Sequence, residues 1–240
     1  HHHRRQQPDR LLAVKRERRP DPPVVMPVEV APLFEAGARS GAPARNLAVL
    51  GLFHVLGLRV HELVALDVSQ LDIVAGVLRR VHGKGGTVTD FPAPPTLAAL
   101  LSYWLRERTM LGHADGPLFP TARPSSSTTG RLSVRSVQRL VGRLAKDAGL
   151  GRTLGPHALR HGCATAAISL GIDVPTTAEV LRHTSIATTQ AYVHLARDAR
   201  REALERIASL IPPSVLPAGA ERKHAEKPRP MGAAGAVDIH

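Results

Sequence analysis

The chain has 240 residues, of which 43% are hydrophobic and only 3% aromatic, so global disorder is excluded and the core must consist of leucine, valine and alanine. Lys and Arg number 32 against 20 Asp and Glu, and the resulting charge of +12 favours a polyanionic partner such as nucleic acid. The single cysteine, Cys163, excludes an internal disulfide and a cysteine-rich zinc module.

The chain divides by composition into an arm, a domain and a tail. Residues 1–26 are basic and end in prolines, which is typical of a mobile arm. Residues 212–240 are rich in proline, glycine, alanine and charge without periodicity, which is typical of a disordered tail. We expect one domain between them, over residues 27–211. No segment is apolar enough to span a membrane and no signal peptide is recognisable, so we expect a cytoplasmic protein without a membrane partner.

Hydrophobic periodicity predicts the elements of this domain. A helical pattern over residues 42–57 ends at Gly57, and a short helix begins just after Arg59. Three short strands follow, joined by glycine-containing turns, over residues 68–74, 76–82 and 87–93. A long loop is expected over residues 112–132, and the other segments are helical: 95–111, 133–150 with Ser133 as its N-cap, 156–170, 175–181, a helix around Tyr192, and 196–210. The predicted class is mainly α with a small antiparallel β-sheet.

The C-terminal third gathers cationic side chains around a tyrosine. His157 and Arg160 are three residues apart at the start of a helix, so both project from its first turn, where the positive helix pole suits an anion. His183 follows, and Tyr192 comes nine residues after it. A tyrosine with this many cationic neighbours is suited to meeting a phosphate group.

Four separated motifs in this order resemble those of the tyrosine recombinase family, which includes phage integrases and chromosome-dimer resolvases. The motifs are VLGLRVHEL, VHGKGGTVTDFPAP, HALRH and LRHTSIATTQAYVH, and the resemblance extends over residues 28–211. It implies a tyrosine recombinase catalytic domain whose catalytic residues are Arg59, Lys84, His157, Arg160, His183 and Tyr192.

The chemistry of these residue types agrees with the roles that the resemblance implies. Arg59 and Arg160 stay charged at any working pH and can clamp phosphate oxygens with paired N–H donors, to which His183 adds a third. Glu62, one helical turn after Arg59, is expected to hold the site by hydrogen bonds.

The remaining residues would move protons and form the covalent bond. Tyr192 attacks phosphorus and forms a 3′-phosphotyrosyl link, with His157 as the candidate base because a phenol has a pKa of about 10. Lys84, at a hairpin tip, protonates the leaving 5′-oxygen. The scheme needs neither a metal nor a nucleotide cofactor, since arginines stabilise the charge and the phosphotyrosine stores the bond energy.

Each of these residues also has an ordinary structural explanation. Arg59 could pair with Glu62, Lys84 could be a solvated turn residue, and Tyr192 could be a buried core tyrosine. His157 and His161 are four apart and could mimic a metal pair, but no acidic or cysteine ligands cluster nearby. The joint order and spacing of the motifs favours the catalytic interpretation.

Double-stranded DNA is the expected partner. Candidate contacts are Arg39, Arg45, Lys84, Arg135, Arg139 and Arg182, the last standing where the family usually has glycine. Family members usually carry a helical core-binding domain before the catalytic domain, whereas only the basic arm precedes it here. Three explanations stay open: a truncated protein, a trimmed sequence, or an arm that alone supplements binding. We expect this chain by itself to bind DNA weakly and with little sequence specificity.

The assembly and the exact activity stay open at this level. We expect a homo-oligomer, a tetramer, on DNA and a monomer without it. The final helix, with Leu195, Leu204, Ile207 and Leu210, either docks on its own domain or fills a groove of a neighbouring subunit. A site-specific recombinase is the leading hypothesis, and topoisomerase-like relaxation and a catalytically silent DNA-binding module are the alternatives.

Overall fold

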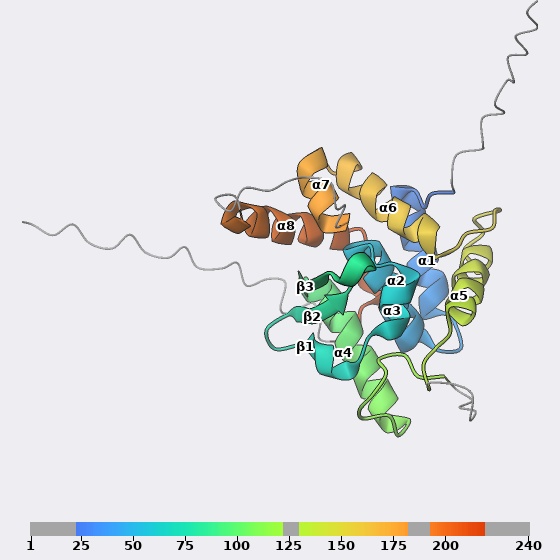
Figure 1. Ribbon diagram of the computed structural model, residues 1–240. Coiled ribbons are helices and arrows are strands. Elements are labelled where there is room, and N and C mark those ends of the chain that lie inside the picture. Colours follow the sequence, from blue (N-terminus) through green and yellow to red (C-terminus); the bar gives the residue numbers. More distant parts are fainter. Residues whose placement is uncertain (1–22, 122–129, 182–192, 219–240) are drawn as a thin grey trace, which may run out of the picture.

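The computed structural model describes residues 23–121, 130–181 and 193–218. It is mainly helical with one three-stranded antiparallel sheet, which confirms the predicted class (Figure 1). The elements in chain order are α1 (Pro27–Ala38), α2 (Pro43–Leu56), α3 (Val60–Ala65), η1 (Val68–Gln70), β1 (Leu71–Asp72), β2 (Val77–His82), η2 (Lys84–Gly86), β3 (Val88–Pro92), α4 (Pro95–Met110), α5 (Val134–Asp147), α6 (Pro156–Ser169), α7 (Val174–Leu181), α8 (Val193–Ala208) and η4 (Pro213–Val215).

The helix α2 runs through the middle of the molecule (Figure 1). Twelve of its fourteen residues are buried, so it is apolar on nearly every side, and α1, α4, α6 and α8 all pack against it. It ends at Gly57, whose φ of +54° is a left-handed conformation that glycine adopts without the steric cost of a Cβ atom. The predicted end of this helix is therefore confirmed, and it places the turn before Arg59 beside the core.

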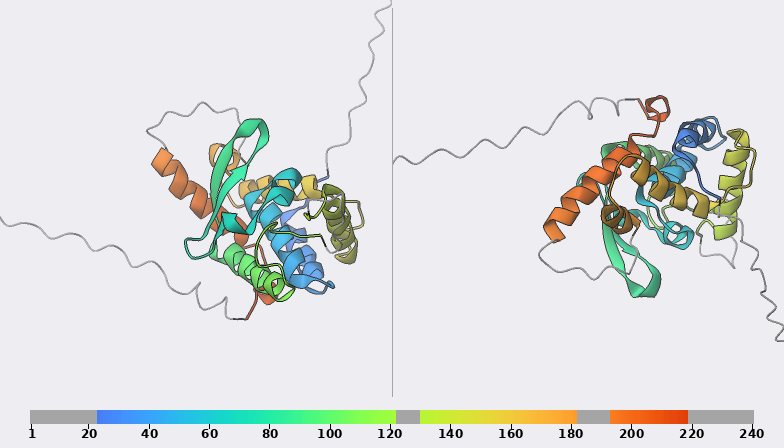
Figure 2. Two further views of the ribbon diagram at one scale, coloured as in Figure 1. Left: turned by 60° about the horizontal axis from the view of Figure 1, so that its bottom comes forward. Right: turned by 90° about the horizontal axis from the view of Figure 1, so that it is seen from above.

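The sheet has the order β1-β2-β3, and the β2–β3 hairpin projects from the helical body (Figure 2). Its register shifts between Leu78 and Val81, which marks a β-bulge, and Arg80 there has a φ of +51°. Side chains hold the bulge: Gln70 Nε2 donates to the Arg80 carbonyl oxygen at 2.8 Å, and the Arg80 N–H donates to Asp90 Oδ1 at 2.8 Å. The direction of the outer hairpin is thus set at its base.

Two predicted elements differ in extent. The predicted strand over residues 68–74 is reduced to Leu71–Asp72, because η1 occupies the three residues before it. The sequence predicts a break between a helix around Tyr192 and a helix over residues 196–210, but α8 is continuous from Val193 to Ala208. Tyr192 itself lies outside the described residues.

The helix α1 is not predicted from the sequence. Pro27 occupies its first turn, Pro32 lies inside it, and prolines in the interior of a helix remove a backbone hydrogen bond. Burial of Val30, Leu33 and Phe34, each at most 2% exposed, compensates for this loss. Local propensity therefore argues against a helix here, whereas the burial of its apolar side chains stabilises one.

Packed structure extends beyond the predicted domain limits of residues 27–211 at both ends. Val25 is 1% exposed, and its N–H donates to the Ala158 carbonyl oxygen at 3.1 Å. Val215, in η4, is 7% exposed. Residues 1–22 and 219–240 lie outside the described part of the chain, so the arm and the tail stay predictions. None of the helices in the described ranges has the length and apolar composition that crossing a bilayer requires.

Candidate active site

Arg59 stands at the N-cap of α3, directly after the turn that ends α2. Its backbone N–H donates to Glu62 Oε2 at 2.7 Å, and its Nη1 donates to Glu62 Oε1 at 3.0 Å. The side chain of Glu62 is 4% exposed, whereas that of Arg59 is 33% exposed. The buried carboxylate therefore holds the arginine from the interior side, and the supporting role of Glu62 in catalysis stays a prediction.

Arg160 lies in the first turns of α6 and is 9% exposed. Its Nη1 donates to the carbonyl oxygen of Gly57, and its Nη2 donates to that of Leu181 at 2.5 Å. Gly57 belongs to the motif that carries Arg59, and Leu181 belongs to the motif that carries Tyr192. One guanidinium group therefore joins the first, third and fourth motifs in space.

The junction around Gly57 is tightly packed. A Cβ atom at this position would lie 2.6 Å from Leu181 Cδ2 and 3.4 Å from Cys163 Sγ. The Cys163 thiol is fully buried and donates to the Val55 carbonyl oxygen at 3.6 Å. Burial raises the pKa of this thiol to about 12, so Cys163 is a structural residue and not a nucleophile. The ends of α2 and α7 thus have one defined position relative to α6.

His157 projects from the same turn of α6 as Arg160, but it is exposed where the arginine is buried. The start of α6 is held by the N-terminal segment, since a Cβ atom on Gly162 would lie 2.6 Å from the Val25 carbonyl oxygen. Arg152 binds Glu29 at 2.6 Å and also donates to the Val24 carbonyl oxygen. The histidine therefore lies on the exposed side of a helix whose other side packs against the N-terminal segment of the described chain.

Lys84 begins η2 at the tip of the β2–β3 hairpin. The tip is closed by a hydrogen bond from the Gly83 N–H to the Thr87 carbonyl oxygen at 2.7 Å. Gly85 and Gly86 follow with φ of 75° and 76°, values that favour glycine. The lysine is thus carried on an outlying turn and not on the helical framework.

His183, Tyr192 and Arg182 lie outside the described residues. The described chain reaches Leu181 on one side of this segment and Val193 on the other. The convergence of all six predicted catalytic residues therefore stays a prediction.

Comparison with known proteins identifies the family of this chain. Residues 24–198, most of the chain, match the Phage integrase family. The chain belongs to this family. Among the relatives of this integrase-family chain, the tyrosine recombinase XerC of Azotobacter vinelandii is 42% identical over 151 residues, which is 63% of this chain and 48% of that protein. The chain thus spans about half the length of the curated relatives it matches.

Solved structures share the fold. The XerA recombinase superposes with a TM-score of 0.60 at 28% identity, covering 75% of this chain and 63% of that one. The XerH site-specific recombinase bound to its difH substrate has a TM-score of 0.53 at 22% identity, covering 73% of this chain and 53% of that one. Both likenesses confirm the tyrosine recombinase catalytic-domain fold.

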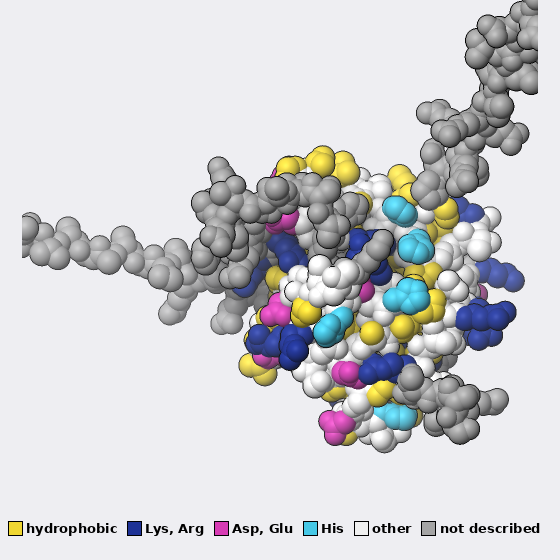
Figure 3. Space-filling model, in the orientation of Figure 1, with side chains coloured by type: hydrophobic (Ala, Val, Ile, Leu, Met, Phe, Trp, Pro, Cys, Tyr) yellow, Lys and Arg dark blue, Asp and Glu magenta, His cyan; other side chains and the backbone are white. Residues whose placement is uncertain are grey.

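Besides Lys84 and Arg182, four arginines of this integrase-family chain are predicted DNA contacts. Arg135 and Arg139 are on the exposed side of α5, whose other side is buried, and dark blue side chains project there in Figure 3. Arg39 is exposed and pairs with Glu35 at 3.7 Å. Arg45 is half-buried, and burial together with nearby Arg143 lowers the pKa of its guanidinium group. Arg143, which is not among the contacts predicted from the sequence, extends the same basic surface.

Histidine side chains gather on the face that α6, α3 and the hairpin share (Figure 3). Exposed histidines on these elements are His61, His82, His157 and His161. No group of three potential metal-binding side chains occurs within residues 23–121, 130–181 and 193–218. Each of these imidazoles carries an N–H that can donate to an anion.

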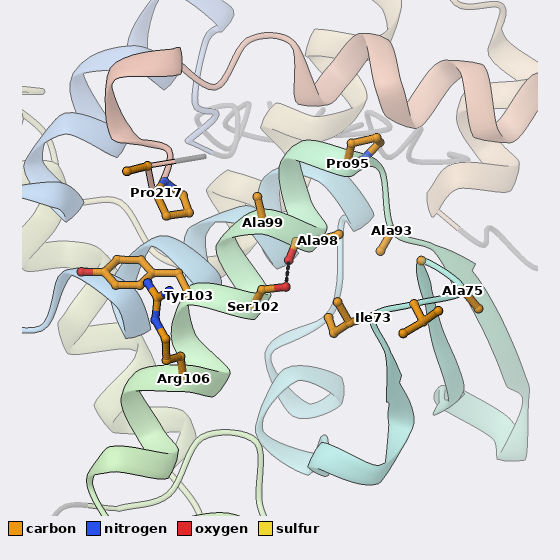
Figure 4. A pocket seen from close by; sticks show the side chains of 13 residues that line it. Ile73, Ala75, Ala93, Pro95, Ala98, Ala99, Ser102, Tyr103, Arg106 and Pro217 are labelled. Carbon is orange, nitrogen blue, oxygen red and sulfur yellow. Dashed lines mark hydrogen bonds between the residues drawn. The ribbon is translucent and has the colours of Figure 1, made fainter. Parts of the chain in front are cut away.

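A cavity of about 440 Å³ lies elsewhere in the integrase fold, beside α4 (Figure 4). Ile73, Ala98, Tyr103, Arg106 and Pro217 contribute to its lining. Arg59, His157 and Arg160, the predicted catalytic residues whose side chains the structure describes, do not line it, and we assign it no part in the reaction.

Proposed function

We propose that this chain is the catalytic part of a site-specific DNA recombinase, which cleaves and rejoins DNA through a 3′-phosphotyrosine intermediate. The contact of Arg160 with the carbonyl oxygens of Gly57 and Leu181 carries the proposal. It brings the turn of Arg59 next to the start of the segment that bears Tyr192. Membership of the Phage integrase family supports the same conclusion.

Double-stranded DNA is the proposed substrate. The net charge of +12 and the exposed arginines of α5 favour a polyanion, because neutralised phosphates release their counterions. Recombination joins two duplexes, so we propose a homo-tetramer on DNA and a monomer without it. We also propose a cytoplasmic location, where chromosomal or phage DNA is accessible.

Charge stabilisation is the first task of the site. The attacked phosphodiester gains negative charge on its non-bridging oxygens, and Arg59, Arg160 and His183 supply N–H donors to them. Glu62 orients Arg59, and two backbone carbonyl oxygens orient the guanidinium plane of Arg160. Donors held in this way need little reorganisation when the charge develops, which is the source of their effect on rate.

Bond exchange is the second task. The Oη atom of Tyr192 attacks phosphorus while its proton passes to His157. The bond between phosphorus and the 5′-oxygen breaks, and the ammonium group of Lys84 gives that oxygen a proton. The products are a 3′-phosphotyrosyl link and a free 5′-hydroxyl. The reverse steps with another 5′-hydroxyl rejoin the strand, so the proposed reaction uses neither a metal nor a nucleotide.

A nicked duplex tests the proposal, because loss of the short leaving strand traps the covalent intermediate. A pool of such duplexes with randomised sequence around the nick is incubated with the chain, and DNA that remains bound in detergent is recovered and sequenced. We expect a covalent protein–DNA product that disappears in Tyr192→Phe. Absence of any covalent product across the pool, with DNA binding intact, would leave a silent DNA-binding module instead.

Recombination and relaxation are then separated with the recovered sequence. Two copies are placed in one supercoiled plasmid, and the products are resolved by size. Deletion or inversion of the intervening DNA supports a recombinase. Relaxed plasmid without rearrangement would identify a topoisomerase-like activity.

A further inference from the structure

The part of α8 from Arg200 onward is anchored to α2, to the end of α6 and to the sheet. His54, on α2, lies with its Nε2 3.1 Å from the Ile207 carbonyl oxygen. Arg206 donates to the carbonyl oxygen of Leu170, at the end of α6. Leu204 and Ile207 are fully buried, so within the described chain this part of α8 packs on its own domain.

The third anchor joins α8 to the sheet. The guanidinium carbon of Arg200 lies 4.6 Å from the centre of the Phe91 ring, a cation–π geometry. Phe91 is fully buried, and the Nε and Nη2 atoms of Arg200 are shielded from solvent. Such contacts are stronger when water is excluded, so this one is well placed to fix the strand against the helix. The helix crosses the hairpin in the left view of Figure 2, and their outer ends diverge in the right view.

Phe91 occupies a particular place in the hairpin. It pairs with Leu78, the last residue in regular register before the bulge at Arg80. Beyond the bulge the hairpin projects from the body and ends at Lys84. A small rotation of the strand at Phe91 therefore moves the outlying tip by a larger distance.

We infer that Arg200 is a positioning residue, which sets the place of Lys84 relative to the helix that follows Tyr192. The inference rests on the proposed recombinase function. In this role Arg200 acts through the ring of Phe91, which it contacts, and not on the reacting atoms themselves. Because Lys84 gives a proton to the leaving 5′-oxygen, displacement of the hairpin slows departure of the leaving group and not the attack by tyrosine.

A change of leaving group distinguishes these two steps. In a 5′-bridging phosphorothiolate duplex, sulfur replaces the 5′-oxygen. A thiol has a pKa of about 8.5, so a thiolate departs without a proton from Lys84. A defect in positioning Lys84 is therefore relieved by sulfur, whereas a defect in positioning Tyr192 is not.

The experiment measures single-turnover cleavage of the nicked duplex trapped by the unaltered chain, in its oxygen and sulfur forms. Arg200→Met keeps the length and apolar character of the side chain and removes the cation. We expect this variant to cleave the oxygen duplex about three- to tenfold more slowly, and the sulfur duplex at nearly the rate of the unaltered chain. Arg200→Lys, which retains a cation for the ring, should recover most of the lost rate.

Two controls define the comparison. Arg201→Met removes the same charge from an exposed neighbour and should match the unaltered chain on both duplexes. Lys84→Ala lacks the proton donor itself, so it should show the largest ratio of the cleavage rate on the sulfur duplex to that on the oxygen duplex. This ratio is the upper limit for the Arg200 variants.

The inference is overturned if Arg200→Met equals Arg201→Met on the oxygen duplex, or if Arg200→Met is slowed equally on both duplexes. Failure of the unaltered chain to cleave any duplex is a different result, because it rejects the proposed function itself. Relief by sulfur within one variant also shows that the variant is folded.

Discussion

The two described parts of the proposed site are built in opposite ways. Arg59 and Arg160 belong to a framework of α2, α3 and α6, in which each is held by buried acceptors. Lys84 belongs to a hairpin with an open tip, where a Cβ atom on Gly85 would meet no other atom within 4 Å. Charge stabilisation requires donors that are already in place, whereas a proton donor must approach DNA that is absent until it binds. In the proposed reaction the rigid framework therefore stabilises charge, and the projecting hairpin carries the proton donor.

The largest expected effect comes from Arg160. Arg160→Lys keeps the charge but cannot reach two carbonyl oxygens and the phosphate with one ammonium group. We expect cleavage of the nicked duplex to slow by at least about a hundredfold. Arg106→Lys, at an exposed position, should leave the rate unchanged. Equal rates for the two variants would show that the framework does not hold a catalytic arginine.

Acid should weaken the framework through His54. Burial lowers the pKa of this histidine from 6.5 to about 4. The unfolded chain therefore binds the proton first, and the free energy of unfolding falls as the pH drops from about 6.5 to 4, by about 3 kcal/mol in total. Urea unfolding at several pH values measures this. On acidification the free energy of unfolding of the unaltered chain should fall relative to that of His54→Leu; a difference between the two proteins that does not change with pH contradicts the assignment.

Substitution of one glycine in the framework and one in the hairpin compares how tightly the two regions are packed. Gly57→Ala introduces a Cβ atom 2.6 Å from Leu181 Cδ2 in a left-handed conformation, and should cost about 2 to 3 kcal/mol of unfolding free energy. Gly85→Ala has the same kind of backbone but no neighbour within 4 Å, so only about 1 kcal/mol is expected. Denaturant unfolding of both variants provides the test. Similar losses would mean that packing at Gly57 is looser than the distances indicate.

The smallest expected effect is a gain of stability at the bulge. Arg80 has a φ of +51°, which glycine tolerates better than arginine. Arg80→Gly should raise the free energy of unfolding by about 0.5 to 1 kcal/mol, because it removes this local strain. Arg79→Gly, on the neighbouring residue, is the matched control and should destabilise the strand. Denaturant unfolding distinguishes the two signs.

Much of the fold could be predicted from local patterns. Gly57 ends α2 as expected, and the side chain of Ser133 accepts the Ser136 N–H at 3.1 Å as the N-cap of α5. Pro156 begins α6 as expected. These features depend on residues within one or two turns of each other, so periodicity and capping chemistry suffice to find them.

The sequence by itself determined the order of the motifs, the family and the residue types that the chemistry requires. Only the tertiary structure decided that α1 forms despite Pro32, that Arg160 binds the carbonyl oxygens of Gly57 and Leu181, and that Arg200 covers Phe91. The physical reason is the same in each case. These contacts join residues that are far apart in the chain or outweigh a local preference, and their free energy exists only once the core has formed.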